Sequence, residues 1–518
     1  MAEWVISTKM LLIHPPVTKP CEPPSGIAKL CGALSSHGVT VGVLDANLEG
    51  LLSLLKDQTV PSDTWTQRAS RHLSRHLSSL KDWNTYHHFD RYKRAVSDLN
   101  RLLDRVALPS GVRLGLANYQ HQELSPARSG DLIRAADRPE DNPFYPYFRK
   151  RLLEFIEDKN SSVVGLSLNY LSQALSAFAM IGFLRREAPG LSLVLGGGLV
   201  TSWMRRPGWT NPFKGLVDHL VAGPGEGHLL SILGIERGEE EETAGRHGAP
   251  NYDPLPMGEY LSPGPILPYS ASSGCYWNTC SFCPEMAEGN PHLPVPPEKV
   301  VDDLQYLVGR HRPVLIHLLD NAISPSLMKV LSERPPGAPW YGFARITHHL
   351  IDPDFCRALR QSGCIMLELG LESGEQDVLD RLQKGVCVDE ASLALRALKK
   401  AGIATYVYLL FGTPPEGLEE ARKTLEFVVT HHEDIDFLNV AIFNLPVYGP
   451  DTKQLDTNFF YEGDLSLYVD FEHPKGWNRK RVRQFLDKEF RRHPAIASIL
   501  RRDPPVFTSN HAPFFVKP

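Results

Sequence analysis

The sequence predicts an α/β protein with two successive parallel sheets, the first open and the second curved into a partial barrel. Short apolar runs alternate with helical patterns along most of the chain, and many of these runs end in glycine or polar residues. A charged, glycine-rich stretch at 236–248 separates two groups of them, as a linker would. A chain of 518 residues with 42% hydrophobic composition can build two or three cores. We expect domains at 1–245 and 246–450, and an extension at 451–518.

The composition gives no reason to expect a polyanionic partner. Lys and Arg number 55 against 60 Asp and Glu, a net charge of −5, so there is no bulk positive field for nucleic acid. The first apolar run, Met10–Ile13, is short and is followed by two prolines, unlike a secretory signal. No later stretch is long enough to span a bilayer. These observations predict a soluble, cytoplasmic protein.

The first domain opens with a strand, a helix and a strand. Met10–Ile13 is apolar throughout, the helix Ile27–Leu34 presents one apolar side, and Gly38 ends it before the strand Val39–Leu44. Such a crossover implies parallel strands, and therefore a Rossmann-like sheet. Further strands are expected at 163–168, 191–195 and 217–222, with a helix at 172–186. Residues 51–150 form a predicted helical insertion of unassigned role, and we expect its aromatic patch at 144–148 to belong to a core or a domain interface rather than to a ligand platform.

The second domain repeats strand and helix six times. The expected strands are 266–271, 314–319, 340–344, 364–369, 405–411 and 438–443. A helix at 389–400, ended by Gly402, is typical of the segments between them. The pattern predicts a partial (β/α)6 TIM-like barrel whose polar groups gather at the carboxyl ends of the strands. After the fifth strand we expect a helix with Thr413 at the N-cap, Pro414 at its first position and Glu416 in a capping box.

Three of the eight cysteines, Cys275, Cys280 and Cys283, lie within nine residues on a loop that follows the first barrel strand. Three close thiols suit a four-iron four-sulfur cluster that keeps one iron open for a ligand. The alternative is a structural zinc site that adds His292 as the fourth ligand. The position at the carboxyl end of a strand favours the cluster, because ligands bind at that end of a barrel.

In the first domain, polar and small residues end the predicted strands. Asp45 and Asn47 follow the second strand, Ser167 ends the third, and Gly196, Gly197 and Gly198 follow the fourth. In open α/β sheets a ligand lies at the carboxyl edge, where glycines let it approach the backbone. The plainer alternative is that Asp45 and Asn47 only cap their loop through Asx-type hydrogen bonds.

These residues resemble the cobalamin-binding domain. Asp45-x-Asn47-x-x-Gly50 stands where that family has Asp-x-His-x-x-Gly, Ser167 where a serine lines the nucleotide tail, and the run at 196–198 where it has Gly-Gly. Asn47 replaces the histidine that would bind cobalt, and an amide is a poor ligand for that metal. The resemblance implies bound cobalamin without a protein histidine below it, or a site that has lost the ligand.

The second domain resembles the radical S-adenosylmethionine enzymes. The resemblance rests on the three cysteines, with Phe282 just before the last, on Gly370-Leu371-Glu372-Ser373-Gly374 after the fourth strand, and on Gly412-x-Pro414-x-Glu416 after the fifth. Two features depart from the family pattern. The first cysteine gap holds four residues instead of three, and the acidic-glycine motif after the second strand is reduced to Asp320-Asn321.

The resemblance also implies roles for individual residues. Cys275, Cys280 and Cys283 would be the cluster ligands, and Phe282 would pack beside the cluster and the adenine of S-adenosylmethionine. Asp320 would accept from the methionine ammonium, Arg345 would pair with the carboxylate, and Glu372 or Ser373 would bind the ribose. For Arg345 a salt bridge at the rim is an equal alternative.

Together these features predict a cobalamin-dependent radical S-adenosylmethionine enzyme that transfers a methyl group to an unactivated carbon or phosphorus centre. The alternatives are radical rearrangement, cyclisation or oxidation without methyl transfer, and a non-catalytic cobalamin- or zinc-binding module. A small-molecule or biosynthetic-intermediate substrate and an electron donor such as flavodoxin or ferredoxin are expected. Past residue 450 we expect a small helical region, whose end, Thr508–Phe515, folds back over the barrel mouth.

Overall fold

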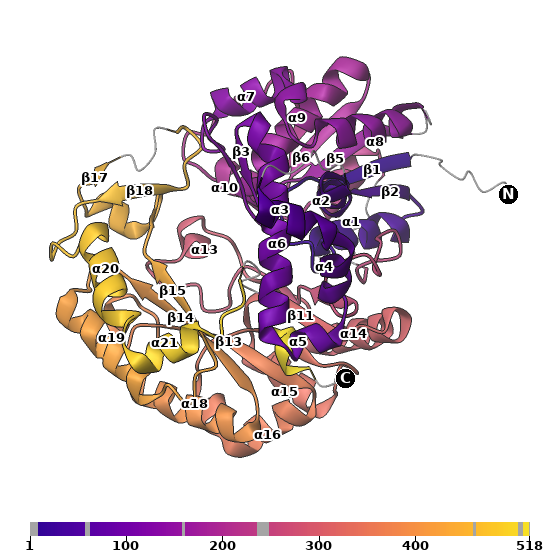
Figure 1. Cartoon of the computed structure of the whole chain (residues 1–518). Coiled ribbons are helices and arrows are strands. Elements are labelled where there is room, and N and C mark those ends of the chain that lie inside the picture. The colour runs from indigo at the N-terminus through magenta and orange to yellow at the C-terminus, as the bar shows by residue number, and fades with distance from the viewer. Residues whose placement is uncertain are drawn as a thin grey trace. The chain divides into compact units, whose positions relative to one another are not determined.

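The computed structural model describes residues 9–56, 63–157, 161–235, 248–458, 463–505 and 511–516. They fall into two compact units (Figure 1). The first runs to Gly264 and includes 463–467 and Pro505, and the second holds the other described residues from Pro265 onward. Both units are α/β with parallel sheets, so the predicted fold class is confirmed. The linker predicted at 236–248 lies almost entirely outside the described residues.

The first unit is built on a five-stranded parallel sheet in the order β2-β1-β5-β6-β7. Its strands are β1 (Lys9–His14), β2 (Thr40–Asp45), β5 (Ser161–Ser167), β6 (Ser192–Gly196) and β7 (His219–Leu220). The helices that connect or follow them are α1 (Ser25–Ser36), α2 (Ala46–Lys56), α9 (Leu171–Glu187), α10 (Gly198–Met204) and α11 (Glu226–Ile232). Met10 and Leu12 of β1 pack with Ile27 and Leu34 of α1, which is the apolar side predicted for that helix.

Between β2 and β5 the chain forms the predicted, mostly helical insertion. It contains α3 (Thr64–Arg71), α4 (Leu73–Leu80), α5 (Trp83–Tyr86), α6 (Phe89–Ala107), the hairpin β3 (Val112–Leu114) and β4 (Tyr119–His121), α7 (Ser129–Asp137) and α8 (Tyr145–Glu157). Phe144 and Phe148 are fully buried, and Phe148 contacts the rings of Tyr145 and Phe183. The prediction that this aromatic patch is core is therefore confirmed for its two phenylalanines.

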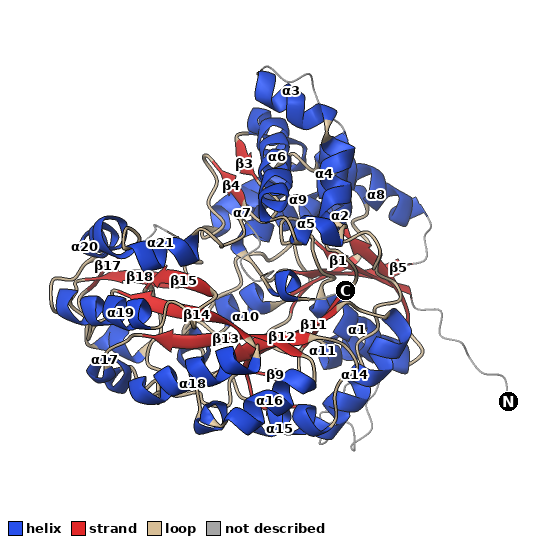
Figure 2. Ribbon diagram, turned by 60° about the horizontal axis from the view of Figure 1, so that its bottom comes forward, coloured by secondary structure: helices blue, strands red, loops and turns tan. Residues whose placement is uncertain are grey.

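The second unit is built on a six-stranded parallel sheet whose order follows the chain, β8-β11-β12-β13-β14-β15. The strands are β8 (Ile266–Tyr269), β11 (Leu315–Ile323), β12 (Trp340–Ala344), β13 (Cys364–Glu372), β14 (Ala404–Phe411) and β15 (Phe437–Ile442). The connecting helices are α14 (Pro297–His311), α15 (Pro325–Glu333), α16 (Pro353–Gln361), α17 (Gln376–Arg381), α18 (Val388–Ala401) and α19 (Leu418–Thr430). Figure 2 shows α15, α16 and α18 along one face of this sheet. All six predicted strands are present.

The extension after β15 contains a small sheet as well as the predicted helices. β16 (Leu445–Pro446), β17 (Thr457–Asn458) and β18 (Tyr468–Phe471) form the sheet, and α20 (Arg479–Phe485) and α21 (Pro494–Leu500) follow it. No helix in the described part of the chain is long and apolar enough to cross a membrane.

The end of the chain does not cover the barrel mouth, so that prediction is wrong for its described part, 511–516. The His511 ring lies 4.3 Å from that of Tyr406 and 4.6 Å from that of Phe437, between ring centroids. Tyr406 and Phe437 lie at the amino-terminal ends of β14 and β15, opposite the cysteine loop. A buried aromatic cluster therefore holds the tail at the far end of the sheet. Residues 508–510 lie outside the described residues.

Candidate functional site

The cysteine loop leaves the carboxyl end of β8 and passes through the short strand β9 (Ser272–Ser273) before Cys275. β9 pairs antiparallel with β10 (Leu293–Pro294), which returns from beyond the third cysteine. Gly274 sits between them with a φ of +73°, and a Cβ there would lie 2.4 Å from the Pro291 carbonyl oxygen. Only glycine fits this position, so the backbone fixes where the first cysteine begins.

The long first gap of the cysteine motif is accommodated at Asn278. This residue has a φ of +43°, in the left-handed region that asparagine tolerates better than most side chains. Asn278 and Thr279 are exposed, whereas Cys280 is buried. The chain thus turns outward within the gap and returns to bury the second thiol.

Asp320, in the second half of β11, is bound to the base of the cysteine loop. One carboxylate oxygen accepts the Ala271 N–H at 3.0 Å, and the other accepts the Ser272 hydroxyl. Burial raises the pKa of Asp320, and the hydrogen bonds from the loop act against that shift. Both oxygens of this residue, which sequence reasoning assigned to the ammonium of S-adenosylmethionine, are used to hold the loop.

A short segment after α17, residues 382–385, holds the cysteine loop from the other side. The Leu382 carbonyl accepts the Ser281 N–H at 3.1 Å, and the Gln383 carbonyl accepts the Trp277 indole N–H at 3.0 Å and the Thr279 hydroxyl at 3.3 Å. Sequence reasoning missed this segment, because backbone carbonyls accept these bonds whatever the side chain.

Gly385 is the residue of segment 382–385 whose type could have indicated the contact with the cysteine loop. Its φ is +63°, and a Cβ there would lie 2.1 Å from the Trp277 ring. The ring can therefore lie against the segment only because residue 385 is glycine.

Arg345, directly after β12, reaches the second cysteine. Its guanidinium lies over the Trp277 ring, 4.1 Å from the centroid, and its Nη1 is 3.9 Å from the Cys280 Sγ. Its Nη2 donates to the Lys384 carbonyl. The residue is 6% exposed, so this cation is held within the loop rather than at a solvent-facing salt bridge.

Lys384 and Glu372 form a second charged group beside the loop. Their ion pair is 2.8 Å long, and the Lys384 ammonium lies 5.6 Å from the Phe282 ring centroid. Glu372 has a φ of +67°, which is uncommon for a residue with a side chain. The structure thus brings two predicted residues, Glu372 and Phe282, to the same place through a lysine that sequence reasoning did not single out.

Ser373 does not face this group. Its hydroxyl pairs with the Thr424 Oγ1 at 3.2 Å and accepts the Glu375 N–H at 3.2 Å. The residue is fully buried where β13 leads into α17. These contacts attach the turn after β13 to α19, so the hydroxyl is occupied structurally.

Burial affects the ionisation of two thiols of the cysteine loop. Burial raises the pKa of the Cys280 thiol, and the charges of Lys384 and Arg345 act in the opposite direction. Burial also raises the pKa of Cys283, to about 11. These thiols therefore need a metal and cations nearby to be held as thiolates, and Arg345 and Lys384 supply the cations.

The alternative zinc site requires four ligands on one ion. Among the described residues, no three His, Cys, Asp or Glu side chains converge closely enough to hold one ion. A four-iron cluster binds each thiolate at a different iron, so its ligands need not converge on one point.

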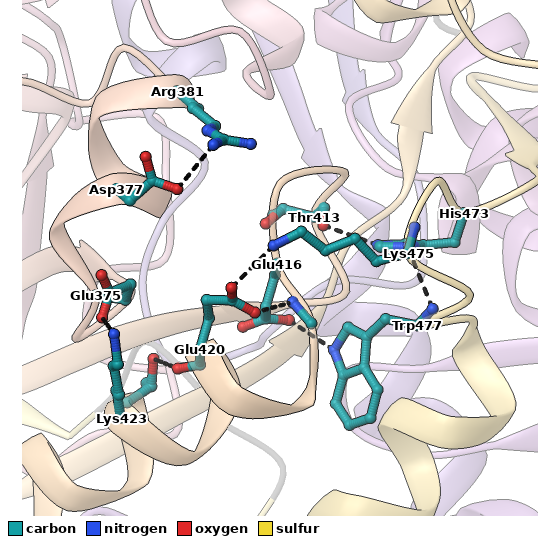
Figure 3. Close-up of polar contacts among 12 residues, drawn as sticks. Glu375, Asp377, Arg381, Thr413, Glu416, Glu420, Lys423, His473, Lys475 and Trp477 are labelled. Carbon is teal, nitrogen blue, oxygen red and sulfur yellow. Dashed lines mark hydrogen bonds and ion pairs between the residues drawn. The ribbon is translucent and has the colours of Figure 1, made fainter.

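The loop after β14 holds a buried carboxyl, Glu416 (Figure 3). It accepts the Gly412 N–H and, at 2.9 Å, the Trp477 indole N–H. Burial raises its pKa to about 8. The predicted capping box is wrong, because α19 begins at Leu418, four residues later than expected. Glu420 instead accepts the Gly417 N–H, at 2.7 Å.

In the first unit, Asp45 and Asn47 are bound within the fold. Asp45 accepts the Leu48 N–H at 2.9 Å and the Tyr260 hydroxyl at 2.7 Å. Asn47 is buried, and its amide makes two bonds to the Thr18 backbone, at 2.8 and 3.1 Å. Asp45 makes the local cap of the alternative interpretation, whereas Asn47 bonds a segment 29 positions away in sequence. Asn47 anchors the loop after β1 with its whole amide.

Ser167 and the glycines lie together at the carboxyl edge of β5 and β6, as expected for paired parallel strands. Asn169 joins them, donating to the Ser167 Oγ at 3.1 Å and accepting the Gly198 N–H at 2.9 Å. Gly197 has a φ of +111°, and a Cβ there would lie 2.4 Å from the Leu168 carbonyl oxygen. The glycine run therefore makes a close turn whose backbone lies at the sheet edge.

Comparison with known proteins identifies the second unit. A family model described as the radical SAM superfamily matches residues 269–428. These residues form a radical SAM domain. They include the cysteine loop, Arg345, segment 382–385 and most of the six strands.

Two curated relatives share sequence with parts of the chain. An uncharacterised methyltransferase of Pyrococcus horikoshii is 26% identical over 260 residues, which cover 46% of this chain and 54% of the relative. The anaerobic magnesium-protoporphyrin IX monomethyl ester cyclase of Rubrivivax gelatinosus is 27% identical over 168 residues, covering 31% of this chain and 30% of the cyclase. The chain thus spans about half or less of the curated relatives that it matches.

Two solved structures share the fold over nearly the whole chain. The radical S-adenosylmethionine methyltransferase TsrM from Kitasatospora setae matches with a TM-score of 0.54 at 14% identity, covering 96% of this chain and 90% of TsrM. The cobalamin-dependent S-adenosylmethionine radical enzyme OxsB matches with a TM-score of 0.58 at 12% identity, covering 93% of this chain and 67% of OxsB. At these identities the matches establish the two-sheet architecture.

Proposed function

We propose that this chain is a cobalamin-dependent radical S-adenosylmethionine enzyme that transfers a methyl group to an unactivated carbon or phosphorus centre. The observation that carries the proposal is the cysteine loop, held at the carboxyl end of a six-stranded sheet by Asp320 and segment 382–385. When bound, an open-iron cluster supplies the electron that cleaves S-adenosylmethionine to a carbon radical.

Residues on and beside the loop would bind the cluster and S-adenosylmethionine. Cys275, Cys280 and Cys283 would bind three irons, and Phe282 would shield the cluster. Glu372 and Lys384 form an ion pair beside Phe282, which offers one acceptor and one cation to the polar groups of S-adenosylmethionine. We propose these two residues as its binding groups because they lie beside Phe282, whereas Asp320 holds the base of the cysteine loop and Ser373 bonds Thr424.

The first unit is proposed as the cobalamin-binding part. One matched TsrM structure is described with cobalamin and a [4Fe-4S] cluster bound, and the OxsB structure with aqua-cobalamin. The glycine turn at 196–198 and Ser167 lie at the sheet edge where a ligand binds in such folds. Because the Asn47 amide is bound to the Thr18 backbone, we propose that residue 47 does not ligate cobalt.

The proposed reaction needs an electron donor and a methyl acceptor. An electron donor such as flavodoxin or ferredoxin would reduce the cluster, and a small-molecule or biosynthetic-intermediate substrate would receive the methyl group. A cluster of this kind survives best in the reducing cytoplasm, where we place the protein.

Anaerobic reconstitution with iron, sulfide and cobalamin, followed by reaction with S-adenosylmethionine carrying a deuterated methyl group, tests this function. The expected result is bound cobalamin that acquires the labelled methyl, together with 5′-deoxyadenosine. A cluster that forms deoxyadenosine without binding cobalamin would replace the proposal with radical chemistry without methyl transfer, as the partial match to the ring-forming cyclase would then favour. Cobalamin bound without a cluster would indicate a binding module.

A further inference from the structure

We propose that Arg345 sets the reduction potential of the cluster, by donating a hydrogen bond and presenting its charge to the sulfur of Cys280. The inference rests on the proposed function, since it needs the cluster on the cysteine loop. Arg345 is then a positioning residue that acts through the cluster, not a partner of the S-adenosylmethionine carboxylate as the sequence resemblance implied.

The geometry holds the guanidinium in place from three directions. The Trp277 ring lies against its face at 4.1 Å, the Lys384 carbonyl accepts from Nη2, and Nη1 points to the Cys280 Sγ at 3.9 Å. Trp277 is itself fixed, because its indole N–H donates to the Gln383 carbonyl. A planar cation held on its face and at one nitrogen has its remaining donors directed, which a flexible lysine would not provide.

Arg345 is also the less compensated of the two cations at the loop. The Lys384 charge is offset by Glu372 at 2.8 Å. Within the described residues, Arg345 contacts the Trp277 ring, the Cys280 thiol, the Tyr276 side chain and backbone carbonyls, and it makes no ion pair with a carboxylate. Its charge therefore acts on the thiolate in a buried setting, where screening by water is weak.

The direction of the effect follows from charge. A reduced cluster carries one more negative charge than an oxidised one, so a fixed cation and an N–H donor at a ligand sulfur stabilise the reduced form. Arg345 would thus raise the potential and make the cluster easier to reduce by a cellular donor. Removing it should make reduction harder without removing a cluster ligand.

The test is an anaerobic potentiometric titration of the reconstituted protein, followed by electron paramagnetic resonance, with iron counted in every sample. Arg345→Gln should lower the midpoint so that the ratio of reduced to oxidised cluster at a fixed potential falls at least tenfold, about 59 mV for one electron. Arg345→Lys, which keeps the charge but not the directed donor, should lie between this variant and the wild type. Arg334→Gln removes an exposed arginine of the same unit and should leave the midpoint unchanged.

The cleavage of S-adenosylmethionine separates this role from a binding role. If Arg345 sets the potential of the cluster, the Arg345→Gln variant should cleave S-adenosylmethionine slowly with a weak reductant. A stronger reductant should restore the rate, and the KM for S-adenosylmethionine should be unchanged. A raised KM that no reductant corrects would overturn the proposal in favour of carboxylate binding.

Two further outcomes are decisive. Arg345→Gln with full iron content and an unchanged midpoint would overturn the inference while leaving the proposed function intact. If that variant does not hold iron, Trp277→Leu replaces it, because it releases the guanidinium from its ring, and an unchanged midpoint there would overturn the inference. Wild-type protein that binds no iron would overturn the proposed function, and this inference with it.

Discussion

Replacing Glu416 with glutamine should make the protein more stable in alkaline buffer and change it little in acid. The buried carboxyl accepts the Gly412 N–H and the Trp477 indole N–H through one oxygen. Glutamine keeps an oxygen for both donors and removes the ionisation. Burial raises the pKa of Glu416 from 4.5 to about 8, against the hydrogen bonds from Gly412 and Trp477, which lower it.

The sign and size follow from proton linkage. Between about pH 4.5 and 8 the folded state keeps a proton at Glu416 that the unfolded state releases, so stability falls as pH rises through this window. A pKa difference of roughly 3.5 at about 1.4 kcal/mol per unit gives at most ~5 kcal/mol at pH 9. Below pH 4.5 both states are protonated, and the wild type and the variant should be nearly equal.

Urea unfolding of the two proteins in the same buffers, from pH 5 to pH 9, measures the difference directly. The quantity of interest is the variant's free energy of unfolding minus that of the wild type, because other titrating groups, including His473, contribute equally to both. Stability curves that run parallel from pH 5 to pH 9 would refute the reasoning. Glu420→Gln is the matched control. Burial raises the pKa of Glu420, but the Lys475 ion pair and neighbouring hydrogen bonds outweigh it and lower the pKa. Glu420→Gln should therefore be less stable than the wild type at pH 7, and this difference in stability should disappear in acid.

Three more substitutions test how the cysteine loop is held. Cys280→Ala should abolish iron binding after anaerobic reconstitution but leave the circular dichroism spectrum unchanged, and retained stoichiometric iron would contradict its role as a ligand. Gly385→Ala places a Cβ 2.1 Å from the Trp277 ring and should cost about 1–3 kcal/mol and lower the iron content, both measurable in one preparation. Asp320→Asn loses one of two acceptors for the loop and should speed hydrogen exchange at Ala271 and Ser272, whereas unchanged exchange would show that the loop does not depend on the carboxylate.

The strands of both sheets could be predicted because each is a short, almost continuous apolar run bounded by polar or glycine residues. β13 and β14 illustrate this, since parallel strands covered on both faces bury nearly every side chain. The cysteine loop could also be located, because its position depends only on which strand it follows. The order and direction of the strands could thus be predicted from residue type and chain order.

The hydrogen-bond partners of single side chains could not be predicted in the same way. Asp320 and Ser373 stand at motif positions near the ends of two strands, yet their hydrogen bonds go to Ser272 and Thr424, which only the folded chain brings near. Glu416 matched a capping pattern with Thr413, but it became buried between Gly412 and Trp477, a residue 61 positions later. A sequence motif shows which side chains can form hydrogen bonds, but the partner of each depends on the tertiary structure.

We propose that the cysteine loop holds an iron–sulfur cluster with one iron open to S-adenosylmethionine. The most direct measurement is the electron paramagnetic resonance spectrum of the reduced, reconstituted protein, recorded with and without S-adenosylmethionine. We expect about four irons per chain and a spectrum that changes when S-adenosylmethionine binds. Zinc in place of iron, or a cluster whose spectrum does not respond to S-adenosylmethionine, would contradict it.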